Sequence, residues 1–302
     1  MIDLAALSAL RAVSDEGSVI GAARALGFTP SAVSQQVKRL ERQAGLPLLE
    51  RVGRGVLLTD AGRQLVEDSS RLLADLEQIR ADLHRTTDTV AGHVRLTAFS
   101  TAMRGIIAPA VRRLLDAHDD LRVTLEEREP WDTVDLVAAG HSDVGVVHSW
   151  GDQPVLVPDH VRTETIAHDE ADVLLPRDHP LAGRPRVATI DLVDEGWIAT
   201  PPGTICRAWL DRMYVGTGRV PRIAHVAMEF DSHIALVDAG LGIALVPRLG
   251  RQPLPDGVVA VPAYDPVPTR TVTVLYRRSS AASPAIRAVV DALRDREGSE
   301  ER

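Results

Sequence analysis

The chain has 302 residues, which is enough for two or three domains with their own hydrophobic cores. Apolar residues make up 45% and charged residues 25%, as in ordinary globular proteins, and no apolar run approaches the roughly 20 residues that span a membrane. The net charge of −8 argues against a protein that binds polyanions non-specifically over its whole surface.

Cysteine content and the N-terminal segment both predict a cytoplasmic protein. Cys206 is the only cysteine, so no disulfide can form within the chain, and no Cys/His zinc spacing is present. The opening residues are interrupted by charge and lack the basic start of a signal peptide. We therefore expect no membrane association, no metal site and no cofactor.

Basic residues are concentrated between Arg24 and Arg54. This segment carries +4, so the rest of the chain carries −12. A basic segment on an acidic protein is suited to local contact with phosphates. Its charged residues are Arg24, Lys38, Arg39, Glu41, Arg42, Glu50, Arg51 and Arg54.

Three helices are predicted before residue 45. Apolar residues from Leu4 to Val13 recur at helical spacing and predict a helix over Asp3–Glu16. The next helix, Ser18–Leu26, has Ser18 as its N-cap and ends at a turn containing Gly27. The third helix has Thr29 as its N-cap and Pro30 at its first position, where the missing N–H costs nothing.

The third helix has two distinct faces. Val33, Val37 and Leu40 form an inner face, whereas polar side chains point outward and suit base edges and phosphates. The outward residues are Ser31, Ser34, Gln35 and Lys38. A strand-like PLLER segment, the triplet Gly53-Arg54-Gly55 and a second apolar run follow. This order predicts a helix-turn-helix followed by a β-wing, which places a helix in the DNA major groove.

A long helix is expected from Thr59 to about Leu83–Arg85. Its apolar residues repeat with heptad spacing, although Gly62 and Ser69 weaken the pattern near its start, and the repeat predicts a coiled coil. The alternative is a single helix packed on its own domain. The residues of the seam are Leu65, Leu72, Leu76, Ile79 and Leu83.

After the linker Thr86–Gly92, strands alternate with helices, and this order predicts an α/β architecture with mostly parallel strands in two lobes. The expected strands are Val94–Phe99, Leu121–Glu127, Val144–Val147, Asp172–Leu175, Trp197–Thr200, Ile223–Met228, Ile243–Val246 and Thr271–Arg277. The expected helices are Arg104–His118, Thr133–Ala139, Ile205–Val215, His233–Ala239 and Pro284–Arg296.

These features together resemble the LysR-type transcriptional regulators. The specific part is AARALGFTPSAVSQQVKRLERQAGLPLLERVGRGVLLTDAG, which is similar to that family's DNA-binding module almost position for position. The resemblance covers the whole chain. It implies a winged helix-turn-helix, a long linker helix and a two-lobed α/β domain like that of periplasmic binding proteins.

The implied domains are a DNA-binding domain over 1–58, a dimerisation helix with its hinge over 59–91 and an effector-binding domain over 92–302. Lobe I takes about 92–162 and 267–302, and lobe II about 163–266. The chain departs from many family members, which have Gln-Pro at Pro30-Ser31 and Arg at Gln35. The operator sequence therefore does not transfer from relatives.

Residues expected to contact DNA lie on the third helix and the wing. We expect Gln35 and Ser34 to reach bases or nearby phosphates, and Lys38 to hold the backbone. Arg54, between two glycines, is free to enter a minor groove, and Arg42 and Arg51 are expected on phosphates. The alternative for each is a solvated side chain. The full predicted set is Thr29, Pro30, Ser31, Ser34, Gln35, Lys38, Arg42, Arg51 and Arg54.

An effector site is expected at the carboxyl ends of the strands, where open α/β sheets bind ligands. The resemblance places it between the lobes. Hydroxyls near helix starts can hold a carboxylate or another polar group, or can simply cap the helices. The predicted residues are Ser100, Thr101, Arg104, His148, Thr200, Thr204, Phe230 and Asp231. The modest supply of aromatic residues, 3% of the chain, argues against a large aromatic ligand.

Catalytic and redox functions find little support. Peroxide-sensing members of the family carry a reactive cysteine in a region similar to that of Cys206, with a second cysteine nearby; the second is missing here, so we expect an inert thiol. Asp231, His233 and Ser100 have no reason to converge, and no GxSxG elbow is present. An enzyme fused to a DNA-binding domain and a transport-type binding protein are the alternatives, and the first 60 residues favour neither.

The sequence thus predicts a homo-oligomeric, effector-responsive transcription factor that is not an enzyme. A dimer would read an interrupted palindrome in double-stranded DNA, with recognition helices about 34 Å or a multiple apart. The resemblance implies tetramers, bent promoter DNA and contact with RNA polymerase. A small-molecule effector would act by shifting the oligomer between geometries. The identity of the effector and the regulated genes are not written in the chain.

Overall fold

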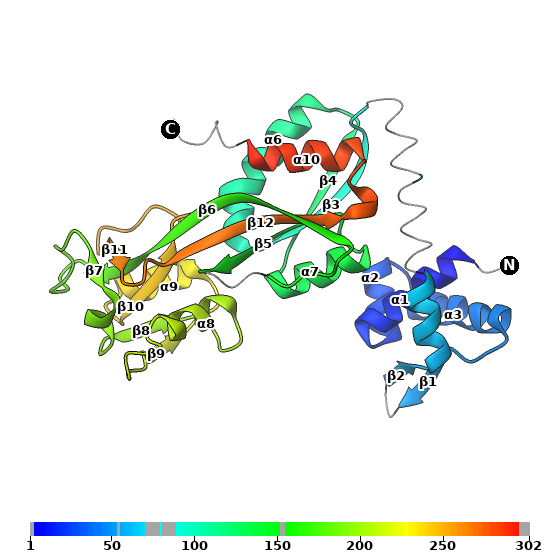
Figure 1. Cartoon of the computed structure of the whole chain (residues 1–302), viewed down its shortest axis with the longest axis horizontal. Coiled ribbons are helices and arrows are strands. Elements are labelled where there is room, and N and C mark those ends of the chain that lie inside the picture. Colours follow the sequence, from blue (N-terminus) through cyan, green and yellow to red (C-terminus); the bar gives the residue numbers. More distant parts are fainter. Residues whose placement is uncertain (1–2, 53–54, 70–78, 80–88, 152–154, 296–302) are drawn as a thin grey trace. The chain divides into compact units, whose positions relative to one another are not determined.

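The computed structural model describes residues 3–52, 55–69, 79, 89–151 and 155–295 (Figure 1). The chain divides into two compact units, described separately below. One comprises Met1–Thr89 with the short segments Ala139–His141 and Arg278–Pro284, and the other comprises the remaining residues. Among the described helices, none combines the length and the apolar character needed to cross a membrane.

The first unit begins with the three expected helices, α1 (Leu4–Glu16), α2 (Val19–Leu26) and α3 (Pro30–Ala44). The predicted caps are confirmed: the Ser18 side chain accepts from the Gly21 N–H, the Thr29 side chain accepts from the Ala32 N–H, and proline opens α3. Each helix ends at a glycine with φ between 61° and 73°, in the left-handed region that favours glycine.

Apolar faces of these helices form one core, and the wing is joined to it. Val33, Val37 and Leu40 of α3 are buried, as the pattern predicts. Strands β1 (Leu49–Val52) and β2 (Gly55–Leu58) pair antiparallel, which confirms the hairpin of the wing. The Glu41 carboxylate accepts from the backbone N–H groups of Leu48 and Leu49, so α3 fixes the start of the wing.

A helix over residues 60–69 follows the wing. The Thr59 hydroxyl accepts from the Gly62 N–H at 3.0 Å and so caps it, as predicted. A Cβ at Gly62 would lie 2.2 Å from the Leu48 carbonyl oxygen, so glycine is required for this close approach of the helix to the wing. The helix was expected to continue to about residue 85, but residues 70–78 and 80–88 lie outside the described part.

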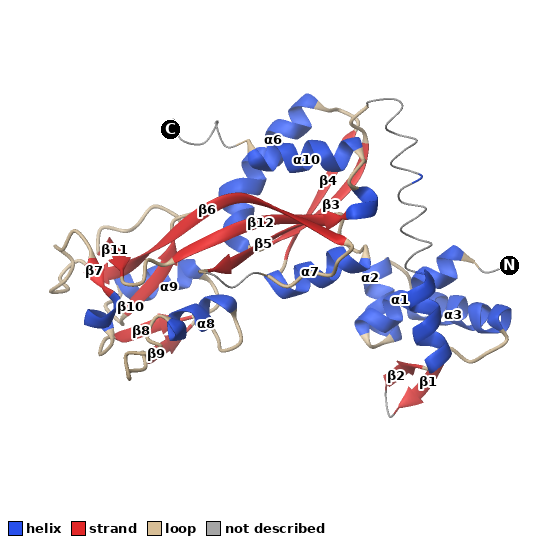
Figure 2. Ribbon diagram, in the orientation of Figure 1, coloured by secondary structure: helices blue, strands red, loops and turns tan. Residues whose placement is uncertain are grey.

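The second unit is built on one sheet with the strand order β4-β3-β5-β12-β6-β10-β8-β9, onto which β11 and β7 pair (Figure 2). Strands β3, β4 and β5 are parallel in the first lobe, and β8, β9 and β10 are parallel in the second. The bounds are β3 Gly92–Ala98, β4 Leu121–Glu127, β5 Val144–Trp150, β6 Val161–Pro176, β7 Val187–Ala188, β8 Gly196–Ala199, β9 Arg222–Val226, β10 Ile243–Pro247, β11 Val258–Tyr264 and β12 Thr269–Arg277.

Two long strands, β6 and β12, connect the lobes and take part in all the antiparallel pairs of this sheet, while its other described pairs are parallel, in line with the expected mostly parallel sheet. Strand β6 runs antiparallel to β12 in one lobe and antiparallel to β10 and β11 in the other. Only Asp172–Leu175 of β6 was predicted, because its first half alternates polar residues with few apolar ones. The sequence pattern also missed β7 and β11.

Helices pack on both sides of the sheet in each lobe. In Figure 2, α6 and α10 lie on one side of the first lobe and α7 on the other. The expected helix Arg104–His118 starts earlier, at Ser100, and passes through a π-helical turn. The bounds are α5 Ser100–Ala102, π-turn Met103–Ile107, α6 Ala108–Ala117, α7 Pro130–Ala139, α8 Ile205–Arg212, α9 Phe230–Asp238 and α10 Pro284–Arg294, with 3-10 turns at Thr189–Leu192 and Arg278–Ser280.

Candidate functional site

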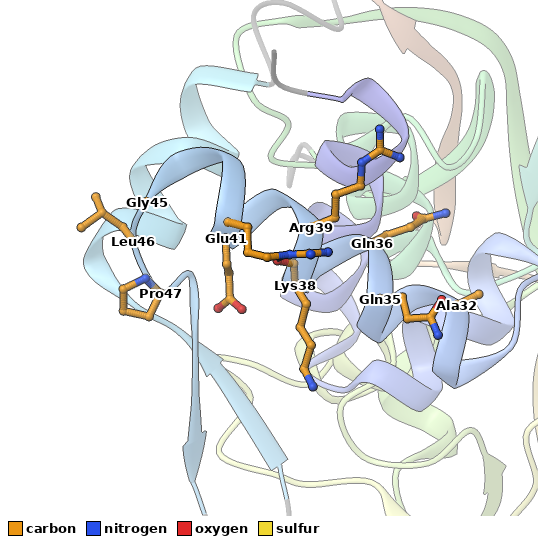
Figure 3. Close-up of a pocket in the computed structure, with 10 residues that line it drawn as sticks. Ala32, Gln35, Gln36, Lys38, Arg39, Glu41, Gly45, Leu46 and Pro47 are labelled. Atoms are coloured by element: carbon orange, nitrogen blue, oxygen red, sulfur yellow. The ribbon is translucent and has the colours of Figure 1, made fainter.

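Helix α3 presents a polar face to solvent. Gln35, Lys38 and Arg42 are exposed and Ser34 is half-buried, while Thr29, Pro30 and Ser31 at the helix start are exposed. In Figure 3, Lys38 and Glu41 point to the same side of α3 and Arg39 to the opposite side. There the Arg39 guanidinium lies 3.1 Å from the Asp3 carboxylate, so this cation is held within its own unit.

An open hollow of about 870 Å³ lies along this face and ends at the turn from Gly45 to Pro47 (Figure 3). Gln35, Lys38 and Arg42 line it, which brings an amide, an ammonium and a guanidinium to one surface, and Arg39 and Glu41 also border it. These groups suit base edges and phosphate oxygens, because an amide pairs with adenine in two places and cations neutralise the backbone.

Other predicted DNA and dimer residues fall partly outside the described chain. Arg51 lies on β1, whereas Arg54 at the wing tip is not among the described residues. Leu65 packs against the core of the first unit, and Ile79 is 55% exposed. Leu72, Leu76 and Leu83 lie outside the described residues.

In the second unit, a buried ion pair links the first lobe to the strands that connect the lobes. The guanidinium of Arg270, on β12, lies 2.8 Å from the carboxylate of Asp169, on β6, and also donates to the Thr101 hydroxyl at 2.8 Å. Asp169 accepts in addition from the Leu249 N–H. Both charged side chains are buried and each faces the opposite charge, as a buried charge requires, while the Nη1 atom of Arg270 is left without a hydrogen-bond partner among the described residues. The Thr101 hydroxyl, which was predicted to contact the effector, accepts a hydrogen bond from Arg270 in this structure.

His148 lies within an aromatic cluster beside this pair. Its ring is 4.5 Å from the Phe99 ring, centre to centre, and 6.4 Å from that of Trp150. The Arg270 guanidinium lies over the same Phe99 and Trp150 rings. Burial, with a further contribution from the charge of Arg270, holds the pKa of His148 well below its ordinary value, so the ring is neutral at pH 7.

Two of the predicted residues of the second lobe, Thr200 and Phe230, line a cavity of about 20 Å³, too small for more than water. Cys206 and His233 also line it. The hydroxyls of Thr200 and Thr204 are 2.6 Å apart, and Thr204 caps α8 by accepting from the Arg207 N–H. The capping interpretation of Thr204 is confirmed. Burial raises the pKa of the Cys206 thiol, which disfavours the reactive thiolate.

Arg104 of the first lobe contacts two residues of the second lobe. Its Nε donates to the Gly250 carbonyl at 3.1 Å, and its Nη2 lies 3.9 Å from the Asp231 carboxylate. Ser100, the first residue of α5, is half-buried. The eight predicted effector residues thus form separate groups, around Arg270, around Thr200 and around Arg104, and do not surround one large cavity.

Sequence reasoning missed Asp169, Arg270 and Trp150. A signal was present: Arg270 alternates in phase with the buried Val272 and Val274 of β12, and Asp169 with Ala171 and Val173 of β6. A charged residue on the apolar face of a strand indicates a buried pair. Among the described residues, no three His, Cys, Asp or Glu side chains gather as ligands for a metal ion.

Comparison with known proteins agrees with this geometry. Residues 4–63 match the bacterial regulatory helix-turn-helix family of LysR type, and residues 87–298 match the LysR substrate-binding domain. The chain is 31% identical to the HTH-type transcriptional regulator YfeR of Shigella flexneri, over 94% of this chain and 90% of that protein. It is also 31% identical to the small neutral protease regulatory protein of Streptomyces coelicolor, over 93% and 84% of the two chains.

A solved structure shares the whole architecture. A variant of full-length OxyR from Pseudomonas aeruginosa has a TM-score of 0.74 and 21% identity, covering 97% of this chain and 95% of that one. The helix-turn-helix, the wing and the two-lobed domain therefore share the fold of a known structure. This chain belongs to the LysR family of bacterial helix-turn-helix regulators, and it is a DNA-binding transcriptional regulator with a C-terminal effector-binding domain.

Proposed function

We propose that this regulator reads its operator with the exposed face of α3. The observation that carries the proposal is the division of this helix, because its apolar face is buried while Gln35, Lys38 and Arg42 line one open hollow. Gln35 and Ser34 contact bases or nearby phosphates. Lys38 and Arg42, with Thr29, Pro30 and Ser31 at the helix start, contact the backbone. Arg51 and Arg54 extend the contact from the wing.

The operator is an interrupted palindrome bound by a dimer. The heptad seam of Leu65, Leu72, Leu76, Ile79 and Leu83 pairs two linker helices, and the 55% exposure of Ile79 supports a face that a second chain covers. Leu65 contributes less, because it already packs on its own domain. Two dimers form a tetramer that spans and bends the promoter. The domain limits that we propose are 1–58, 59–91 and 92–302.

A small-molecule effector binds between the lobes and changes the geometry of the oligomer. The lobes are joined by β6 and β12, which pair side by side and are linked by Asp169 and Arg270, and contacts such as Arg104 with Asp231 also connect the lobes. An effector that prefers one arrangement of the lobes shifts the population toward it, and this shift alters operator bending.

The protein acts by binding and performs no catalysis of its own. Its buried Arg270 and Asp169 are paired with each other, and the family to which it belongs consists of regulators. We place its action in the cytoplasm, where it meets double-stranded DNA and RNA polymerase.

Footprinting of the intergenic region beside the protein's own gene, across a salt series, tests this function. The expected result is a protected interrupted palindrome whose affinity falls steeply with salt. Protection that is absent both there and in genome-wide binding, with an intact dimer, would contradict it.

A further inference from the structure

A second, larger pocket of about 420 Å³ lies between α7 of the first lobe and α8 of the second (both labelled in Figure 1). Its volume falls within the range of small-molecule sites. It differs from the small cavity around Thr200 and Cys206, and the two share only Trp150 among their lining residues. This pocket has room for a small molecule, whereas the cavity beside Thr200 does not.

Tryptophan gathers in this pocket. Three of the chain's four tryptophans line it, namely Trp131, Trp150 and Trp209. The rings of Trp150 and Trp209 are stacked, 5.8 Å apart at 14°, and Trp131 stands at 41% exposure on the first turn of α7. A Cβ at Gly151 would lie 2.6 Å from the Trp209 ring, so the backbone fits closely against the stack. Flat apolar walls of this kind favour a flat ligand.

The pocket also holds buried polar atoms that the described part of the chain leaves without a partner. The indole N–H of Trp209 and the Nδ1 atom of His148 are both buried and make no hydrogen bond there. Each belongs to a side chain that lines the pocket and is more than nine-tenths buried. A buried indole N–H normally donates to an acceptor. The unsatisfied Trp209 N–H therefore indicates that the ligand supplies an acceptor.

Among the described residues that line the pocket, Asp135 contributes one carboxylate and Arg212 one guanidinium, so neither sign of charge is in excess. Beside His148, the charge of Arg270 is paired with Asp169. A ligand of either charge would meet no excess of the opposite charge among these residues, and its desolvation would oppose binding.

From the tryptophan walls and the unpartnered indole and imidazole nitrogens, we propose that this pocket binds a neutral, planar aromatic molecule of one or two rings that carries a hydrogen-bond acceptor. This proposal rests on the proposed function, because such a molecule bound between α7 and α8 contacts both lobes and so acts as the effector. The Trp209 N–H donates to the acceptor, as does His148 in the tautomer that carries its proton on Nδ1, and the tryptophan rings hold the aromatic part.

Ligand-observed NMR titration of the full chain tests the pocket with four probes. Benzamide carries the ring and a neutral acceptor, cyclohexanecarboxamide keeps the amide without a planar ring, and benzoate and benzylamine carry opposite charges. Benzamide is expected to bind more tightly than each of the other three. Equal binding of cyclohexanecarboxamide, tighter binding of either charged probe, or no benzamide binding would overturn the proposal.

Two variants test whether benzamide binds in this pocket. Trp131→Ala, at an exposed position, and Trp209→Phe, which keeps a ring but removes the N–H, are each expected to weaken benzamide binding about fivefold. Tyr264→Ala removes a similarly exposed aromatic ring (36% exposed) outside the pocket and is expected to leave binding unchanged. If both pocket variants bind benzamide as the unaltered chain does, the site is wrong.

Footprinting separates this inference from the proposed function. Benzamide that binds through Trp131 and Trp209 yet leaves the operator footprint unchanged would uphold the pocket and contradict its role as effector site. A footprint that responds to another compound, with the response intact in both variants, would uphold effector regulation and overturn the assignment of this pocket.

Discussion

Arg270 and Asp169, 101 residues apart in the chain, form a buried ion pair whose nitrogen and oxygen are 2.8 Å apart, at directly opposite positions of the antiparallel strands β12 and β6. Beyond Asp169, β6 continues into the second lobe, where it pairs with β10 and β11, so the ion pair lies where the lobes are connected. Arg270 also donates a hydrogen bond to Thr101 on α5.

Breaking this pair should be costly. Arg270→Met leaves the Asp169 carboxylate buried without its counter-charge, so we expect the free energy of unfolding to fall by about 3–5 kcal/mol in urea denaturation. The exposed Arg184→Met is the control and should change it by less than about 0.5 kcal/mol. A loss below about 1 kcal/mol for Arg270→Met would show that the pair is not essential to the domain.

His148 should make stability depend on pH. Its pKa in the folded state lies well below the ordinary value of 6.5, mainly through burial, so the unfolded chain binds more protons as pH falls below 6.5. Stability is therefore retained above that pH and lost on acidification. Between pH 7.5 and 5.5, His148→Gln should lose about 1 kcal/mol less than the unaltered chain. His233, whose pKa is lowered mainly by burial, contributes in the same direction and remains in both proteins. Equal losses in the two proteins would contradict this assignment.

Cys206 should be a slow thiol. Burial raises its pKa, with the Arg270 charge opposing, so little thiolate exists at neutral pH. Alkylation by iodoacetamide at pH 7.5 is expected to be at least about tenfold slower than that of glutathione, and faster as pH rises. Operator binding should be the same before and after treatment with hydrogen peroxide. Rapid alkylation at pH 7.5 would instead indicate a redox role.

Gln35 should determine which base is preferred at the operator position that it contacts. Replacing it with alanine removes an amide from the exposed face of α3, and we expect operator affinity to fall by about 1–3 kcal/mol with relaxed preference at the base that it contacts. The control is Gln43→Ala, on the same helix, where the amide oxygen accepts from the Asp3 N–H. If Gln35→Ala selects the same base sequence as the unaltered chain in a binding-site selection, Gln35 does not contact bases.

Lys38 should contact the phosphates of the DNA backbone and not a base. Lys38→Ala is expected to weaken binding to all sequences alike and to reduce the slope of log affinity against log salt by about 1. Arg39→Ala, whose guanidinium pairs with Asp3 on the opposite side of α3, should change the slope less. A change of preferred sequence with an unaltered slope would assign Lys38 to a base.

The DNA-binding half could be predicted from sequence because its determinants are local. Ser18 and Thr29 cap helices within three residues of themselves, and Pro30 opens α3. The effector domain depends on pairs such as Arg270 with Asp169, which local pattern does not connect. For the same reason the tryptophans at 131, 150 and 209 gave no sign of one pocket until β5, α7 and α8 were placed. The first half of β6 was missed because it holds few apolar residues.

The central claim is that two copies of α3 read a symmetric operator. Selection of binding sites from random duplex DNA by the full-length protein tests it most directly. The account predicts enrichment of an interrupted inverted repeat whose half-site centres lie about one helical turn, or a multiple, apart, and loss of preference within the half-sites for Gln35→Ala. Enrichment of a single unpaired site, or the same selected sequence from the variant, would contradict it.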